Sequence, residues 1–107
     1  PKFQENRVSK TGIDAETLVL DLDTRVYRYL GLALENTGNN DLNYRITALA
    51  RYDGEIEVQI VPPTTLGAGV SVFEALDVTK YARIKLYASA STSGSPSDIL
   101  IEYIMKT

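Results

Sequence analysis

The clearest structural signal in the chain is LNYRITALARYDGEIEVQIV, residues 42–61. Apolar residues alternate with mainly polar ones from Leu42 to Tyr52, and a second alternating run follows Asp53-Gly54. A period of two places the apolar side chains on one face of a strand. The dipeptide Asp53-Gly54 is typical of a tight turn between antiparallel strands. The pattern therefore predicts a β-hairpin over residues 42–61, which Pro62-Pro63 should end.

Short segments of similar character flank this hairpin, and turn-forming residues separate them. The segment ENTGNND at 35–41 concentrates Asn, Gly and Asp, which favour turns, and SASTSGSPSD at 89–98 has the composition of a flexible loop. DVTKY at 77–81 is long enough for a single helical turn with Asp77 as its N-cap. The strands expected outside the hairpin lie at residues 17–22, 25–35, 70–76, 82–90 and 99–106.

The expected fold is an all-β antiparallel sandwich of two sheets with about seven strands, either immunoglobulin-like or jelly-roll, because no long amphipathic helix is evident. A small barrel is the alternative. The 107 residues suit one domain, which we place at residues 17–107. Residues 1–16 carry sparse apolar side chains and are predicted to be an extended N-terminal arm, with simple terminal disorder as the alternative.

The composition argues against most catalytic chemistry. The chain contains neither Cys nor His, which removes disulfides, thiolate nucleophiles, the commonest general base and the usual zinc, copper and haem ligands. Its net charge is −3, with 11 basic and 14 acidic residues mixed along the chain. The sequence therefore has no positively charged region of the kind that binds nucleic acid. We therefore expect no enzyme activity, no cofactor, no resident metal and no nucleic-acid partner.

Three residue groups invite a chemical interpretation, and each has a simpler one. Asp21 and Asp23 could bind Ca²⁺ or Mg²⁺, Glu55 and Glu57 could pair as in a glycosidase, and Gly67–Gly69 could cradle a phosphate. The calcium-loop pattern is missing, paired carboxylates occur on nearly every amphipathic strand, and the glycines do not open a helix. We expect turn residues and solvated surface at all three places.

The N-terminal sequence bears on location. PKFQENRVSK has no apolar core typical of a signal peptide, and no apolar run approaches the roughly 20 residues of a membrane helix. Pro1 is the residue that removal of an initiator Met would leave. We therefore expect a chain made in the cytoplasm, with no membrane insertion.

Aromatic and doubly apolar segments indicate protein contacts. The chain has seven Tyr, two Phe and no Trp, and Tyr is enriched at interfaces. The last strand has apolar residues in both registers, as an interior strand or an oligomer interface would, and the arm could add a strand to a neighbour. The candidate interface residues are Phe3, Val8, Ile13, Tyr87, Leu100 and Ile104.

A resemblance can be stated from these elements. The strand ending in LENTGNN at 34–40, the long alternating strand after it, the late strand YARIKLYA at 81–88 and a closing hairpin resemble small immunoglobulin-like or jelly-roll sandwich domains. Such domains serve as capsid decoration, cement or tail-associated proteins of tailed phages, and occur in bacterial surface and envelope proteins. The resemblance implies a non-enzymatic structural role through protein surfaces, by self-association or in a repeating assembly such as a capsid, and a location in a virion. The alternative is a small carbohydrate-binding or adhesion module, which needs an exposed Tyr platform or a cation site.

Overall fold

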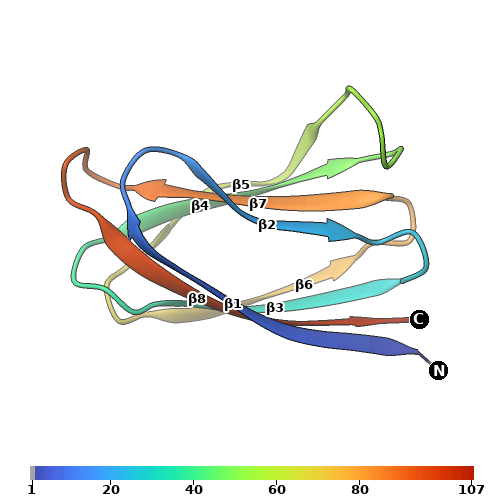
Figure 1. The fold of residues 1–107 in the computed structure, drawn as a ribbon, viewed down its shortest axis with the longest axis horizontal. Helices are drawn as coiled ribbons and strands as arrows, with labels where there is room; N and C mark the ends of the chain where they lie inside the picture. Colours follow the sequence, from blue (N-terminus) through green and yellow to red (C-terminus); the bar gives the residue numbers. More distant parts are fainter. Residues whose placement is uncertain (1) are drawn as a thin grey trace.

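The computed structural model describes residues 2–107, which form two antiparallel sheets of four strands each (Figure 1). Sheet A, the lower layer in the figure, has the order β1-β8-β3-β6 and consists of β1 (Phe3–Ile13), β8 (Ser97–Lys106), β3 (Tyr29–Asn36) and β6 (Ser71–Asp77). Sheet B, the upper layer, has the order β2-β7-β4-β5 and consists of β2 (Thr17–Asp23), β7 (Arg83–Ala90), β4 (Leu42–Leu49) and β5 (Val58–Leu66).

This strand order is that of an eight-stranded jelly roll. The chain crosses from one sheet to the other at every connection of the described strands except that between β4 and β5. The predicted all-β antiparallel sandwich is confirmed, and the jelly roll is the topology it adopts. The described residues include no helix that could cross a membrane.

The eighth strand comes from the stretch expected to be an N-terminal arm. Residues 3–13 are extended, and they lie at the edge of sheet A, paired with β8 from Phe3↔Lys106 to Lys10↔Ile99. Most β1 side chains are exposed, so the alternation that identifies a strand in a sequence is missing here. Gly12, at a positive φ of 65°, lies within a bulge that brings Ile13 into the core, where it is 2% exposed.

The core fills the space between the two sheets. The alternation predicted for Leu42, Tyr44, Ile46 and Ala48 is confirmed, because all four side chains are buried. Full burial of one large aliphatic side chain stabilises a fold by about 1.5–3 kcal/mol, so these residues supply much of the driving force. The largest fully buried side chains are Ile13, Leu30, Leu32, Leu34, Leu42, Ile46, Leu66, Ile84, Leu86, Ile99, Ile101 and Met105.

The predicted hairpin forms, but its connection is longer than expected. Residues 50–57 lie outside both strands, and Gly54 N–H donates to the carbonyl of Arg51 within a turn. Strand β5 begins only at Val58 and runs through Pro62-Pro63, which were expected to end it. Proline is tolerated there because β5 is an edge strand and need not donate on its outer side.

The short segment after β6 is a turn rather than one turn of helix. Asp77 ends β6 and accepts hydrogen bonds from the N–H and hydroxyl of Thr79, at 3.0 and 2.6 Å. Tyr81 N–H then donates to the carbonyl of Val78 at 3.0 Å. Asp77 therefore accepts a hydrogen bond from a backbone N–H, as predicted, but it does so in a turn and not at the start of a helix.

Candidate interaction surface

The outer side of sheet A is a broad surface that no other described segment covers. Because Leu30, Leu32 and Leu34 point into the core, the alternate residues of β3 point outward, and the strand register places their partners on the same side. We call this surface the open face. It consists of Phe3, Glu5, Arg7 and Ser9 of β1; Leu100, Glu102, Ile104 and Lys106 of β8; Tyr29, Gly31, Ala33 and Glu35 of β3; and Ser71, Phe73, Ala75 and Asp77 of β6.

All four strands contribute apolar residues to the open face. Phe3 and Phe73 are 64% and 61% exposed, and Ile104 is half-buried. A Cβ atom on Gly31 would lie 2.9 Å from the Tyr29 hydroxyl and 3.0 Å from Cζ of Phe73, so the ends of both side chains lie over this glycine. Exposed apolar side chains grouped on one face are a feature of protein-interaction sites.

The open face also has a shallow apolar hollow at one end. It encloses about 400 Å³ beside Phe3 and Ile104, and the side chains of Lys2, Glu5 and Lys106 surround it. The two termini lie together at this end, where Thr107 N–H donates to the carbonyl of Lys2 at 3.1 Å (Figure 1). A contact on the open face would therefore involve both ends of the chain.

The structure brings three of the six candidate interface residues together. Phe3, Leu100 and Ile104 all lie on the open face. Val8 packs against the core and Ile13 is buried, while Tyr87 lies on the outer side of sheet B.

Sequence reasoning missed Phe73 and Tyr29 as members of this surface. The segment VSVFEAL at 70–76 has apolar residues in both registers, so its sequence did not reveal which side faces the core. Only the half-buried Val72 and Leu76, which pack against the core cluster, show that Phe73 points outward.

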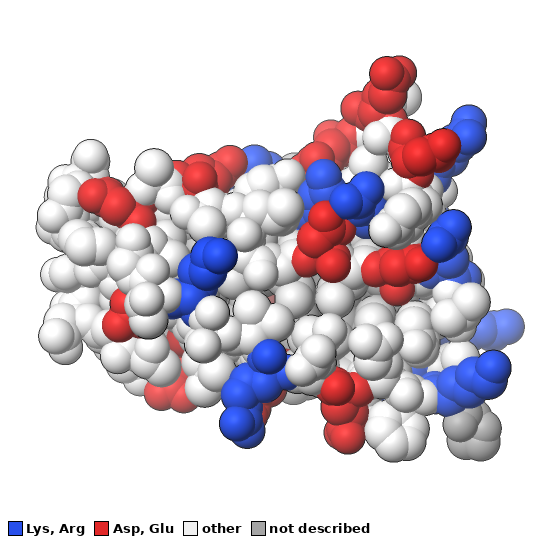
Figure 2. All heavy atoms as spheres, in the orientation of Figure 1, with Lys and Arg blue, Asp and Glu red and all other residues white. Residues whose placement is uncertain are grey.

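The outer side of sheet B carries several charged pairs, whereas the open face carries the ion pair of Arg7 and Glu102, at 2.8 Å. Arg83 pairs with Asp21 and Arg45 pairs with Glu16, each with a closest N–O distance of 2.7 Å. The Arg45 guanidinium also lies 4.3 Å from the centre of the Tyr87 ring. Figure 2 shows acidic and basic side chains close together at the upper right of the molecule. This side offers a partner few unsatisfied groups.

The network on sheet B also determines the ionisation of its carboxylates. The hydrogen bond from Tyr87 lowers the pKa of Glu57, and Arg83 lowers the pKa of Asp21 by hydrogen bonding. Burial, together with the hydrogen bond to Glu57, raises the pKa of Tyr87 to about 12. Every resolved carboxylate shift among the described residues is downward, so these groups are ionised at neutral pH. None of them is held protonated to serve as a general acid.

Of the candidate cation and glycosidase residues, Asp21, Asp23 and Glu57 make ion pairs or hydrogen bonds, while Glu55 is exposed in the β4–β5 connection. Asp21 pairs with Arg83, and Asp23 pairs with Arg25 at 2.7 Å. Glu57 accepts hydrogen bonds from the hydroxyls of Tyr87 and Thr47, at 2.7 and 2.8 Å. Within residues 2–107, no group of three Asp or Glu side chains is arranged to hold a metal ion.

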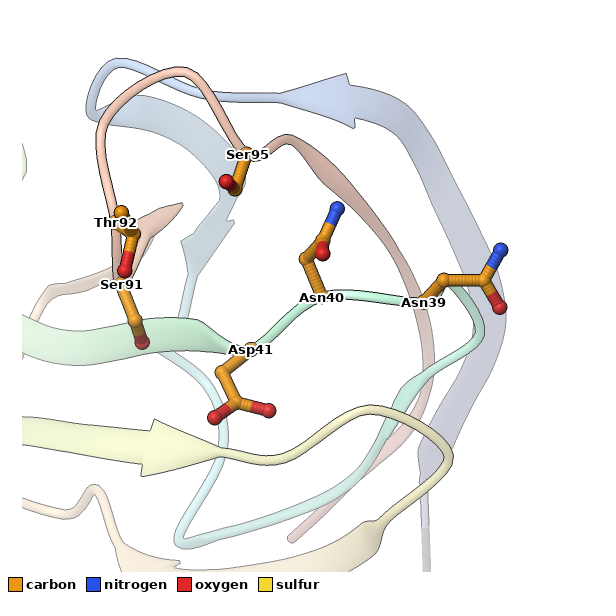
Figure 3. Close-up of a pocket in the computed structure, with 6 residues that line it drawn as sticks. All are labelled: Asn39, Asn40, Asp41, Ser91, Thr92 and Ser95. Atoms are coloured by element: carbon orange, nitrogen blue, oxygen red, sulfur yellow. The ribbon is translucent and has the colours of Figure 1, made fainter.

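A second hollow lies at the opposite end of the sandwich, between the β3–β4 and β7–β8 loops (Figure 3). It encloses about 250 Å³ and is lined by Asn39, Asn40, Asp41, Ser91, Thr92 and Ser95. Asn40 donates to the carbonyl of Pro96 at 2.8 Å, and Asp41 accepts a bond from the N–H of Ala68 at 3.1 Å. Figure 3 shows the side chains of Asn39 and Asp41 pointing away from Ser95, so the polar groups of this hollow do not converge on one point.

Comparisons with solved structures find the same fold in other proteins. The crystal structure of PirA matches with a TM-score of 0.64 and 14% identity, covering 94% of this chain and 92% of that one. The SPBc2 prophage-derived protein YomS matches with a TM-score of 0.60 and 10% identity, over 95% and 94% of the two chains. A protein of Bacillus endospore appendages, described as disulfide-linked pili, matches with a TM-score of 0.59 and 8% identity, over 98% and 87%.

These likenesses establish the class of fold. The chain is a jelly roll of two four-stranded sheets, and its fold is similar to those of a prophage-derived protein and an appendage protein, as the resemblance stated from the sequence implied. At identities of 8 to 14% they show the fold alone. No protein-family model and no curated protein matches the chain.

Proposed function

We propose that this chain is a non-enzymatic structural protein of a repeating assembly, such as a phage virion, and that it acts through the open face. The observation that carries the proposal is the uncovered apolar surface around Phe73, Tyr29 and Ile104. Structural likeness to a prophage-derived protein and to an appendage protein supports it by analogy of fold. In this proposal the protein is located in the virion or, before assembly, in the cytoplasm.

The size of the open face indicates how strong such a contact is. Four strands and four rows of side chains span about 19 by 24 Å at ordinary strand spacing and rise, or roughly 450 Å² on one copy. An interface of about 900 Å² in total lies at the weak end of specific protein contacts. Weak contacts suit a repeating assembly, because many of them act together in one particle.

The proposal is tested by the solution mass of the full chain across a concentration series from about 10 μM to about 1 mM, a range that spans weak dissociation constants. Wild type is expected to form reversible higher-mass species. Phe73→Asp should raise the dissociation constant at least about tenfold, because it buries a charge in the contact. Ile56→Asp is the matched control, since Ile56 is 78% exposed in the β4–β5 connection, outside the open face.

Two further measurements keep the test decisive. Circular dichroism and thermal unfolding establish that each variant folds, and Phe3→Asp replaces Phe73→Asp if the latter does not. A wild-type chain that stays monomeric up to about 1 mM would refute assembly through self-association. Equal weakening by Ile56→Asp would show that the open face is not the contact.

The second candidate function is a small carbohydrate-binding or adhesion module, and the loop-end hollow of Figure 3 is the observation that favours it. Its amide and hydroxyl lining is typical of groups that bind sugar hydroxyls. Tyr52 and Tyr87 already bind guanidinium groups, since Arg25 and Arg83 lie 4.4 and 4.9 Å from the centre of the Tyr52 ring and Arg45 lies 4.3 Å from that of Tyr87. A sugar that stacks on these rings would have to compete with the arginines. Glycan titration of a monomeric chain, followed by amide shifts at residues 39–41 and 91–95, distinguishes this candidate from the first.

A further inference from the structure

We propose that the open face binds the open face of a second copy of this chain, about a two-fold axis that runs parallel to the strands and passes between β8 and β3. The inference rests on the proposed function and names the partner and the geometry of its contact. A row is a set of four outward residues that lie side by side across the strands, such as Glu5, Ile104, Gly31 and Ala75. The axis keeps every residue in its own row and exchanges the β1–β8 half of the sheet with the β3–β6 half. Strands β1 and β8 of one copy therefore lie on β6 and β3 of the other.

The two halves of the open face differ in relief, and this difference makes the face self-complementary. The β3–β6 half is low, because Gly31, Ala33 and Ala75 are small and the rings of Tyr29 and Phe73 lie over Gly31. The β1–β8 half carries longer side chains, including Ile104, Arg7 and Glu102. Exchange of the halves therefore places projecting side chains on low ones, with Ile104 of one copy against the two aromatic rings of the other.

Charges are also compatible in this arrangement. Lys106, which lies 5.8 Å from the centre of the Tyr29 ring in its own chain, also faces Tyr29 of the second copy. The Arg7–Glu102 ion pair, at 2.8 Å, stays intact and faces Phe73 and Ala33. Glu5 lies opposite Ala75, and no like charges face each other directly. At the ends of the face, Phe3 lies opposite Asp77 and Leu100 lies opposite Glu35, where water still reaches the carboxylates.

The other two-fold axis that stacks these sheets runs across the strands, and it is less favourable. It keeps the strands aligned and reverses the rows, so the longer side chains of β1 and β8 would meet their own copies, and the small residues of β3 would meet each other. Glu5 would lie opposite Arg7 in this arrangement, but the relief of the two halves would no longer match. The first axis therefore gives the better contact.

Cysteine cross-linking distinguishes the two axes, because the chain has no natural cysteine. Full-length Glu5→Cys and Ala75→Cys proteins are mixed in equal amounts and treated with a bismaleimide that spans about 10 Å, the usual spacing of stacked sheets. A covalent heterodimer is expected, at a yield several-fold above that of either protein alone. Thr92→Cys, in the distant β7–β8 loop, replaces Ala75→Cys in the matched control mixture.

Each alternative outcome has a defined meaning. A heterodimer from Glu5→Cys with Arg7→Cys, in place of Ala75→Cys, would overturn the proposed axis while the self-association of the proposed function stands. Association of wild type that Phe73→Asp weakens, without cross-linking in either mixture, would overturn the two-fold contact alone. A wild-type chain that remains monomeric, with no cross-link above the Thr92→Cys control, would overturn both the contact and the proposed function.

Discussion

Replacement of Asn36 by Ala should destabilise the protein more than any exposed polar substitution, because Asn36 holds one end of the sandwich together. Its side chain is fully buried at the end of β3. The amide nitrogen donates to the carbonyls of Asn40 and Leu66, at 2.8 and 2.9 Å. The amide oxygen accepts bonds from the N–H of Gly38 and the hydroxyl of Ser97, at 3.1 and 2.7 Å.

The magnitude follows from these four hydrogen bonds. A protein hydrogen bond contributes about 0.5–1.5 kcal/mol net, so Asn36→Ala is expected to lower the free energy of unfolding by about 4 kcal/mol. This is a large part of the roughly 5–15 kcal/mol by which small domains are stable. The loss also frees the β3–β4 turn from Leu66 and Ser97, which belong to strands of different sheets.

Urea unfolding at pH 7 measures this effect, with Asn39→Ala as the control. Asn39 is exposed in the same turn, and its replacement should change the free energy of unfolding by less than about 0.5 kcal/mol. Asn36→Asp adds a pH test, because a buried carboxylate facing two carbonyls has a raised pKa and loses stability as pH rises. Equal stability of Asn36→Ala and Asn39→Ala would refute the argument.

Three further predictions concern other parts of the molecule. Deletion of residues 1–12 should lower the melting temperature, because it exposes the edge of β8; an unchanged transition would show that these residues are a separable arm. Tyr44→Phe should cost about 1.5–3 kcal/mol in urea unfolding, because the Tyr44 hydroxyl donates to the Glu74 carboxylate across the two sheets; a loss below about 0.5 kcal/mol would contradict this. The folded-state pKa of Asp21 lies below its ordinary 3.8, so the Asp21 carboxylate contributes fully to the free energy of unfolding above pH 3.8, and this contribution is lost as pH falls through the folded-state pKa. Asp21→Asn should therefore have a lower free energy of unfolding than wild type at pH 7. Its free energy of unfolding should also fall less between pH values of about 5 and 2, and parallel pH profiles of the two proteins would contradict this.

Local patterning predicted those elements in which one face of a strand is buried. Residues 42–49 and 83–90 alternate clearly in sequence because nearly every second side chain, such as Leu42 or Ile84, is buried in the core. The residues between them lie on the outer side of sheet B, where most are half-buried and Thr47 and Leu49 are buried. Turn chemistry at ENTGNND was also correct in kind, since Asn36 bonds to the backbone of its own turn. Because the sequence contains no Cys or His, it predicted a surface for protein contacts rather than a catalytic site, and the candidate site in the structure is such a surface.

The open face could be predicted only in part. Phe3 was a candidate as one of the sparse apolar residues of the predicted arm, and Leu100 and Ile104 were candidates because the last strand has apolar residues in both registers. Their membership of one surface depends on β1 pairing with β8 and on β8 pairing with β3, contacts between residues that are far apart in the sequence. Phe73 escaped prediction because β6 has apolar residues in both registers.

The amino-acid sequence by itself determined that this chain is an all-β sandwich with turns rich in Asn, Gly and Ser, since alternation and turn propensity are local properties of a segment. Tertiary structure alone decided that residues 3–13 form a strand, that the strands follow jelly-roll order, and that sheet A keeps an uncovered apolar side. An edge strand with little buried surface leaves no alternating pattern, and the choice of neighbouring strands depends on packing across the whole core. For the same reason, the residues of the open face become one surface only when the sheet has formed.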